Sequence, residues 1–205
     1  MFVVIFEVRP RPQRWADYLD TAALLRPELE RIAGFVSNER FRDRCHPGAV
    51  LSLSTWQDEK ALIRWRAHGG HHLAGQTRGR SEIFQDYRLR VGEVTLDSDL
   101  AGGVAPDQVR FDHTAVGVTP VVTVTERGAA AGPETQLPEA VLERASYDSL
   151  RDPGRRVTVA TWSDAAAAAA WTGWGGPGRH RVVRVIREYG LRDRREAPQY
   201  FPEPG

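Results

Sequence analysis

One stretch of this chain occurs twice, and the repeat constrains the fold more than any other feature of the sequence. Residues 47–72, PGAVLSLSTWQDEKALIRWRAHGGHH, are largely repeated further along as PGRRVTVATWSDAAAAAAWTGWG. The tryptophans keep their spacing, because Trp56 with Trp162 and Trp65 with Trp171 are each separated by 106 positions. Two halves of the chain therefore share one design.

Each copy predicts a strand followed by a capped helix. Residues 51–56 and 157–162 alternate with a period of two, which is typical of a strand with one face on a helix layer and the other on a cavity. Asp58 and Asp164 follow as short polar residues suited to a helix N-terminus. Residues at helical spacing come next and end at a tryptophan in both copies.

The first half predicts the element order βαββαβ. We expect a strand at 2–8, a helix at 15–33 that Pro27 kinks or divides, a strand at 35–41, the repeated strand and helix, a loop at 79–82 and a strand at 84–94. This order is that of the ferredoxin-like arrangement, in which one antiparallel sheet carries both helices on one face. The other face is bare and apolar, so it must be covered, and the second half can cover it.

The second half follows a segment rich in Gly, Asp and Ala. We divide the chain into a first domain at 1–95, a linker at 96–112, a shorter second domain at 113–190 and a Pro-rich C-terminal tail at 191–205. In the second domain we expect strands at 116–125 and 182–189 and a short helix at 137–145. The predicted fold class is α+β, with two tandem ferredoxin-like repeats packed sheet to sheet.

Composition removes several classes of function. The formal net charge of +1 gives no electrostatic reason to bind nucleic acid or an acidic membrane. The single Cys45 cannot form an internal disulfide, and cysteine-based zinc sites need more sulfur. The N-terminus leads directly into strand-like sequence without a basic signal region, and no apolar run approaches the roughly 20 residues of a spanning helix. We expect a soluble cytoplasmic protein.

The chain resembles the antibiotic biosynthesis monooxygenase family of dimeric α+β barrels. The resemblance is carried by LSLSTWQDEKALIRWRAHGGHH and GRSEIFQDYRLRV in the first half, and by VTVATWSDAAAAAAWTGW and VVRVIREYGLRDRREAP in the second. It implies that the halves form an intrachain pseudo-dimeric barrel, with a pocket in each half between its sheet and its helices. A further homodimer of the whole chain is an open alternative. Proteins sharing this barrel include cofactor-free oxygenases, haem-degrading enzymes and members with no known reaction.

The candidate site lies in the first half. The candidate catalytic residues are His71, Tyr87 and Trp65, and the candidate substrate-binding residues are Ser52, Trp56, His68, His72, Phe84 and Arg88. If the helix continues through Gly69 and Gly70, Trp65, His68 and His72 share one helical face and His71 lies about a quarter turn away. Such a face could hold an aromatic substrate while a histidine moves a proton. The alternative is a core tryptophan beside solvated histidines at a helix end.

The family resemblance also bears on the strand that precedes Trp56. The cofactor-free oxygenases of the family use an Asn four residues before this tryptophan to bind an oxygenated aromatic. Here that position is Ser52, and in the second copy it is Thr158. Both hydroxyls can still donate a hydrogen bond from the same strand face. The second copy otherwise has no counterpart of His71 or His72, so we expect the working pocket in the first half.

These observations predict a cofactor-independent monooxygenase acting on an aromatic or polyketide-like small molecule. No metal site is expected, because histidines around a diglycine hold no fixed geometry and no carboxylate is spaced to complete a triad. No Gly-rich loop for a nucleotide cofactor is present. Two alternatives are a haem-binding or haem-degrading barrel protein and a non-catalytic module for a small hydrophobic ligand. The spacing of the haem-degrading relatives would place a histidine about ten residues after Trp65, where this chain has Gly75.

Overall fold

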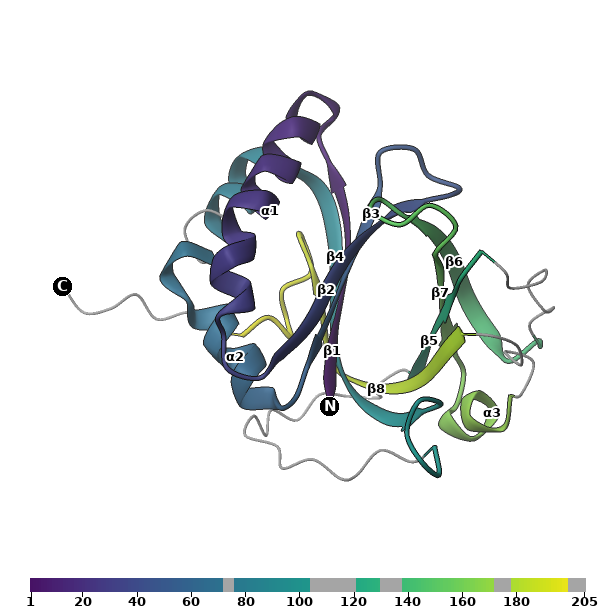
Figure 1. The fold of residues 1–205 in the computed structure, drawn as a ribbon. Helices are drawn as coiled ribbons and strands as arrows, with labels where there is room; N and C mark the ends of the chain where they lie inside the picture. Colours follow the sequence, from purple (N-terminus) through teal and green to yellow (C-terminus); the bar gives the residue numbers. More distant parts are fainter. Residues whose placement is uncertain (72–75, 104–120, 130–137, 172–177, 199–205) are drawn as a thin grey trace.

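The chain forms a closed antiparallel barrel with helices on its outer surface (Figure 1). The computed structural model describes residues 1–71, 76–103, 121–129, 138–171 and 178–198. The elements of the first half are β1 (Phe2–Pro10), η1 (Pro12–Arg14), α1 (Trp15–Glu30), β2 (Phe35–Asp43), β3 (Val50–Trp56), α2 (Glu59–Ala67), η3 (Gly79–Ile83) and β4 (Phe84–Asp97). Those of the second half are β5 (Val121–Arg127), β6 (Val141–Ser149), β7 (Arg156–Trp162), α3 (Ala165–Ala170) and β8 (Gly178–Gly190).

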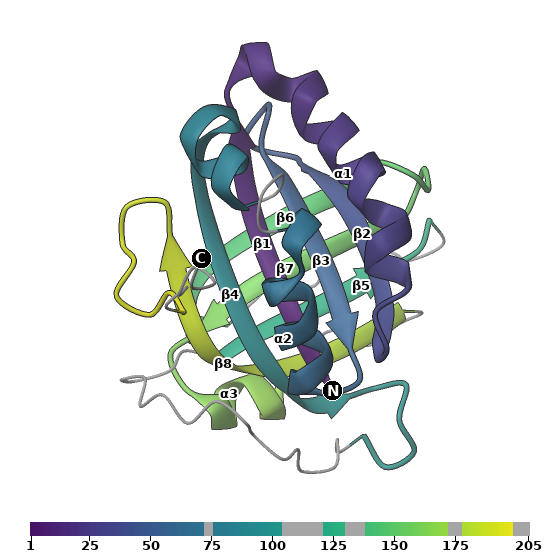
Figure 2. The ribbon, with the colours of Figure 1, turned by 90° about the vertical axis from the view of Figure 1, so that its left-hand side faces the viewer.

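The order of strands around the barrel is β1-β3-β2-β6-β7-β5-β8-β4. Each half contributes four neighbouring strands, and the halves meet where β2 pairs with β6 and where β4 pairs with β8. Figure 2 shows α1 and α2 lying across the outer face of the first-half strands. The predicted α+β barrel, with two sheets closed against each other, is confirmed.

The two halves match in strand register as well as in sequence. Phe2 pairs with Trp56 between β1 and β3, and Val121 pairs with Trp162 between β5 and β7. Phe2 is the first residue of β1 and Val121 is the first residue of β5, so both strands begin opposite the repeated tryptophan. The 106-residue offset of the sequence therefore also relates the two halves of the barrel.

Alternation along the strands separates two kinds of core. On β3, Leu51 and Leu53 are buried in the barrel interior among valines of both halves. Trp56 points to the opposite face and packs with α2 residues such as Ala61 and Leu62. Because successive side chains of a strand point to opposite faces, the same strand serves the interior and the helix layer.

The helix starts follow the expected caps. The Asp58 carboxylate accepts a hydrogen bond of 2.8 Å from the Ala61 N–H, and the Asp164 carboxylate accepts one of 2.7 Å from the Ala167 N–H. Each satisfies a backbone donor that the first helical turn leaves without a partner. Within the described residues, no helix is both long and apolar enough to cross a membrane.

Four local predictions differ from the structure. Residues 137–145 do not form a helix: Val141–Ser149 is the strand β6, and residue 137 lies outside the described residues. Pro27 does not divide α1, which runs through it with Leu25 and Leu29 buried on either side. Residues 79–82 belong to the helical turn η3 rather than to a loop, and β4 continues to Asp97. In each case packing against the barrel overrides the local preference.

Candidate functional site

The outer face of the first-half sheet carries two buried clusters beneath α1, α2 and η3. One cluster is centred on Trp56, and Trp65 of α2 packs against it. The other is centred on Tyr18, Phe84 and Tyr87. Leu89 contacts both, so the two clusters form one continuous, largely apolar layer between sheet and helices.

Trp65 contacts two of the predicted histidines, although the helix does not continue through Gly69 and Gly70 as the predicted shared face required. α2 ends at Ala67, and His68 follows with an extended backbone. The Trp65 ring nevertheless stacks on the imidazole of His71, with centroids 4.4 Å apart, and on that of His68, with centroids 5.6 Å apart. The rings of Trp65, His68 and His71 therefore meet across the break of the helix at His68 and not on one continuous helical face.

His71 contacts two neighbouring groups through its Nδ1. Its Nδ1 lies 3.1 Å from the backbone carbonyl of Trp65, which can only accept a hydrogen bond. The amide of Gln76 lies 3.2 Å from the same nitrogen and donates to the Arg66 carbonyl at 2.8 Å. His71 Nδ1 therefore lies between a carbonyl that accepts and an amide group that can donate. His68 differs, because its Nδ1 faces the carboxylate of Glu28 at 3.5 Å.

Tyr87 belongs to an aromatic group at the other end of the layer. Its ring lies 5.5 Å from that of Phe6 and 5.8 Å from that of Phe84, and Tyr18 meets Phe84 edge-on at 6.2 Å. Such tilted and edge-on contacts are the favoured geometries for aromatic pairs. Tyr87 and Phe84 are each 8% exposed, so the group is nearly closed to solvent.

The hydroxyl of Tyr87 is held by a residue from the far end of the chain. Arg194 Nη1 donates to the phenol oxygen at 2.5 Å, and its guanidinium lies 5.3 Å from the ring centre of Tyr189. Burial raises the pKa of Tyr189, with a further contribution from Tyr87. Because Arg194 occupies the oxygen of Tyr87 as an acceptor, the hydroxyl proton remains for a second partner.

The side-chain amide of Asn38 lies beside Ser52. Ser52 occupies the position at which the cofactor-free oxygenases that the chain resembles have an Asn. Asn38 on β2 donates from Nδ2 to the Ser52 hydroxyl at 3.0 Å and to the Leu53 carbonyl at 3.3 Å. Arg40, two residues further along β2, places its guanidinium 5.9 Å from the ring centre of Tyr18. Burial raises the pKa of Tyr18, and the charge of Arg40 opposes this rise.

Three predicted site residues remain: Trp56, Arg88 and His72. Trp56 is 1% exposed, and its indole N–H donates a hydrogen bond of 3.0 Å to the Ser54 hydroxyl, so its side chain is part of the core. Arg88 points to the opposite face of β4, where Nη1 donates to Glu143 at 2.5 Å and Nε donates to Glu188 at 2.7 Å. His72 lies outside the described residues.

The second half has a smaller equivalent of the helix layer. Trp162 and Trp171 lie with ring centroids 5.6 Å apart, and His180 meets Trp171 edge-on at 5.6 Å. His180 Nδ1 lies 2.8 Å from the Thr125 hydroxyl. Burial lowers the pKa of His180 to about 4, so the imidazole is neutral at physiological pH.

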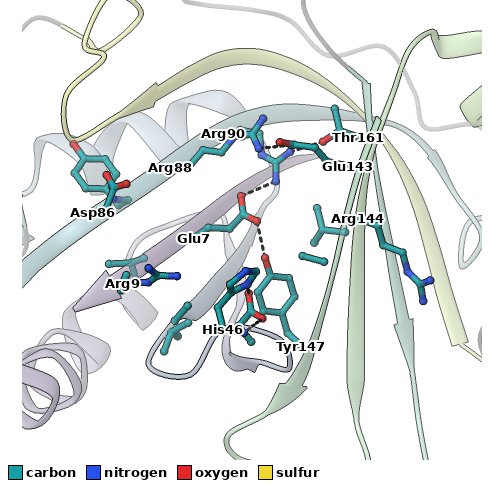
Figure 3. A pocket seen from close by; sticks show the side chains of 17 residues that line it. Glu7, Arg9, His46, Asp86, Arg88, Arg90, Glu143, Arg144, Tyr147 and Thr161 are labelled. Atoms are coloured by element: carbon teal, nitrogen blue, oxygen red, sulfur yellow. Dashed lines mark hydrogen bonds and ion pairs between the residues drawn. The ribbon is translucent and has the colours of Figure 1, made fainter. Parts of the chain in front are cut away.

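A separate cavity of about 560 Å³ lies at one end of the barrel interior (Figure 3). A hydrogen-bonded network crosses its floor. Arg90, 2% exposed, donates to Glu7 at 2.7 Å and to the Thr161 hydroxyl at 3.0 Å, and the Tyr147 hydroxyl donates to Glu7 at 2.6 Å. Burial and the charge of Glu7 both raise the pKa of Tyr147, so this phenol stays protonated.

The sequence carried a signal for some of these residues and none for others. Tyr18 lies in the predicted periodicity of the first helix, but nothing in that pattern gives it a role beyond the core. Asn38 sits on a predicted strand and becomes notable only when β2 is placed beside Ser52. Arg194 lies in a tail without periodicity, so no sequence pattern predicts its contact with Tyr87. Among the described residues, no group of three His, Cys, Asp or Glu side chains could hold a metal ion.

Comparisons with known proteins agree with this architecture. Residues 1–78 match the family model for antibiotic biosynthesis monooxygenase. Over 217 aligned residues the chain is 39% identical to the jasmonate monooxygenase ABM of Pyricularia oryzae, covering 98% of this chain and 99% of that relative. The chain belongs to the antibiotic biosynthesis monooxygenase family, and these similarities support a monooxygenase-type function.

Solved structures share the fold at low sequence identity. An aldoxime dehydratase aligns with a TM-score of 0.53 at 10% identity, over 90% of this chain and 80% of its own. An aldoxime dehydratase in complex with butyraldoxime aligns with a TM-score of 0.56 at 8% identity, over 90% of this chain and 79% of its own. At such identities the likeness concerns the fold alone.

Proposed function

We propose that the chain is a cofactor-independent monooxygenase whose reaction takes place in the first half, between the sheet and α1 and α2. The observation that carries this proposal is the joining of the Trp65–His71 stack and the Tyr87–Arg194 pair by one continuous apolar layer. The layer combines a group that can accept a proton with a phenol whose proton is available, in surroundings that exclude water.

The chemistry balances without a bound cofactor when the substrate has an acidic methylene group. Removal of one proton gives a carbanion that can reduce oxygen, and the peroxide formed on carbon loses water to leave a carbonyl. One CH₂ group and one O₂ give one C=O group and one H₂O, so the substrate supplies all four electrons. A hydroxylated product would instead need two electrons from an external reductant.

Two side chains have proposed catalytic roles. His71 is the base that removes the proton from carbon, and Nε2 takes this role when Nδ1 donates to the Trp65 carbonyl. The hydroxyl of Tyr87 donates to the oxygen atom on which negative charge develops, in the manner of an oxyanion donor. Trp65 would hold the substrate by stacking, as it already holds the two imidazoles.

The proposed substrate is an oxygenated, mostly apolar small molecule of the aromatic or polyketide-like class. The apolar layer, with Ser52 and Asn38 as its polar points, suits such a compound. The name of the Pyricularia relative adds jasmonate as a second compound to test.

Oxygen uptake by the purified protein tests the proposal. An anthrone and jasmonate are supplied in turn, with no reductant, and product and O₂ are counted together. We expect one O₂ per carbonyl product, a fall of about 10²-fold in kcat for His71→Gln, and full activity for Trp171→Phe beside a strong loss for Trp65→Phe. A strict need for a reductant, or equal losses in the two tryptophan variants, would contradict the proposal.

The absorption spectrum of the same sample tests cofactor independence. We expect no visible band and no saturable change when haemin is added. A Soret shift that saturates at one equivalent and disappears in His71→Gln would replace this proposal with haem binding.

A further inference from the structure

The two ends of the barrel interior carry equivalent buried hydrogen-bond networks. At one end further charged side chains fill the space beside the network, and at the other end a cavity remains. At one end Arg90 donates to Glu7 at 2.7 Å and to Thr161 at 3.0 Å. At the other end Arg181 donates to Glu126 at 2.5 Å and to Thr55 at 3.1 Å. In both, the arginine and the glutamate come from one half and the threonine comes from the other.

The end around Arg181 is filled by an ion pair of the chain itself. Arg155 lies 2.9 Å from Glu39 and also contacts Glu126, so that two guanidinium groups converge on Glu126. The positions 106 residues away from Arg155 and Glu39 are Ala49 and Ala145. Both alanines line the cavity at the opposite end. The cavity therefore exists where two alanines replace a charged pair.

The backbones at these positions are equivalent, so the difference lies in the side chains. The Asp43 N–H donates to the Ala49 carbonyl at 3.0 Å, and the Ser149 N–H donates to the Arg155 carbonyl at 2.9 Å. Glu39 of β2 pairs with Leu53 of β3, and Ala145 of β6 pairs with Val159 of β7. The second pair lies 106 positions after the first. The space of about 560 Å³ is within the range of small-molecule sites.

The deep acidic groups of the cavity already have donors. Glu7 is held by Arg90 and Tyr147, and Glu143 is held by Arg88. Asp43 is turned into its own hairpin, where it accepts backbone N–H groups at 2.8 and 2.9 Å.

The mouth leaves one cation without an acceptor. Asp86 accepts the Tyr87 N–H at 2.9 Å, and Arg9 pairs with Asp86 only through the strand register. Among the described residues, the Arg9 guanidinium has no hydrogen bond or ion pair. Apolar contacts come from the walls, where Val8, Val50 and Val159 line the same space.

We propose that this cavity is a second binding site, and that it takes a small organic carboxylate with a short apolar body. The carboxylate binds Arg9 at the mouth, and the body lies against the valines and Ala145. The sheet separates most of this cavity from the proposed reaction site: Arg88 and Arg90 face the cavity, whereas Tyr87, which also lines it, packs its ring among the aromatic residues of the helix layer.

Calorimetric titration with hexanoate, and with hexanamide as its uncharged match, tests the proposal on the full chain. We expect saturable binding of hexanoate at one equivalent and at least about tenfold weaker binding of hexanamide, because charge-assisted hydrogen bonds to the guanidinium are lost. The double variant Ala49→Arg/Ala145→Glu copies the ion pair of the other end into the cavity and should abolish binding. Hexanamide binding as tightly as hexanoate, or preferred binding of hexylamine, would overturn the proposal.

Two further variants keep the test decisive if the double variant fails to fold. Arg9→Gln changes an exposed side chain and should weaken hexanoate binding about tenfold. Methyl resonances of Val159 in the barrel interior should shift on titration, whereas those of Leu62 under α2 should not. Trp65→Phe, which lies in the proposed reaction site, should bind hexanoate normally, so failure of one proposal does not mimic failure of the other. If a folded Ala49→Arg/Ala145→Glu variant still binds hexanoate, the proposal that the cavity is the binding site is wrong.

Discussion

Arg194 donates a hydrogen bond of 2.5 Å to the phenol oxygen of Tyr87. The contact brings a residue that follows the last strand of the barrel onto the aromatic group of the first half. Backbone bonds hold the turn in place, since the Gly190 N–H donates to the Asp193 carbonyl at 2.8 Å and the Leu191 N–H donates to the Tyr87 carbonyl at 3.3 Å. The segment after β8 is therefore part of the candidate site rather than a free tail.

Removing this guanidinium should impair turnover more than stability. In Arg194→Ala the Tyr87 hydroxyl loses its donor, so its proton is no longer directed to the substrate. We expect kcat to fall about tenfold with little change in KM, because the interaction strengthens only as charge develops. Tyr87→Phe should lose at least as much. Arg194→Lys, which can still donate one hydrogen bond, should recover part of the rate.

A purely structural role for Arg194 makes a different forecast. In that case Arg194→Ala would lower the melting temperature and reduce the active fraction, while kcat per folded molecule stayed native. Oxygen uptake normalised to the folded fraction separates the two. An unchanged normalised kcat would rule out a positioning role.

The buried arginines of the barrel interior should be among the most costly side chains to remove. Arg181 is 1% exposed and its pKa is lowered by burial, although the charge of Glu126 opposes this. Arg181→Met leaves Glu126 buried beside fewer donors, and breaking a buried pair in this way costs about 3–5 kcal/mol of unfolding free energy. The double variant Arg181→Met/Glu126→Gln should recover much of that loss in a urea titration. Equal stabilities of the single and double variants would show that Glu126 does not depend on the pair.

The Asp97–Arg179 pair should contribute stability that acid removes. Burial alone would raise the pKa of Asp97, but hydrogen bonds of 3.0 and 2.6 Å from Arg179 outweigh it and hold the pKa below its usual range. A carboxyl group with a lowered folded pKa stabilises the fold above its unfolded pKa, about 4, and loses this contribution as pH falls through the folded value. The stability gap between native protein and Asp97→Asn should be constant above pH 5 and shrink below pH 4. A constant gap down to the lowest measurable pH would contradict the assignment.

The barrel was predictable because its strands alternate so regularly. The alternation of residues 51–56 and 157–162, at a fixed offset, required two equivalent sheets with apolar faces to cover, and pairing those faces closes the barrel. The helix predicted at 137–145 failed for a physical reason. Its sequence, LPEAVLERA, contains good helix formers, but residues from Val141 onward lie between β7 and β2 and complete the ladder of both.

The candidate site was less predictable than the fold because it depends on contacts across the chain. Tyr87 and Arg88 were assigned to one site, yet neighbours on a strand must point to opposite faces, and Arg88 lies in the barrel cavity. Trp65 and His71 meet across the break of the helix at His68, which no periodicity describes. The replacement of Arg155 and Glu39 by Ala49 and Ala145 is visible in the sequence, but its meaning requires the barrel.

His180 should make the fold sensitive to mildly acidic pH. The ring is 1% exposed, lies 2.8 Å from the Thr125 hydroxyl, and has its pKa lowered to about 4 by burial and by the charge of Arg127. In the unfolded chain its pKa is about 6.5, so between these values the unfolded state binds the extra proton. The neutral imidazole therefore contributes stability that is fully present above pH 6.5 and is lost as pH falls toward 4. The slope should reach about 1.4 kcal/mol per pH unit in urea titrations. His180→Gln has no such proton to bind and should flatten the profile between pH 6.5 and 4.5, above the range in which most carboxyl groups titrate. A slope of equal size in His180→Gln would assign the acid sensitivity to other groups.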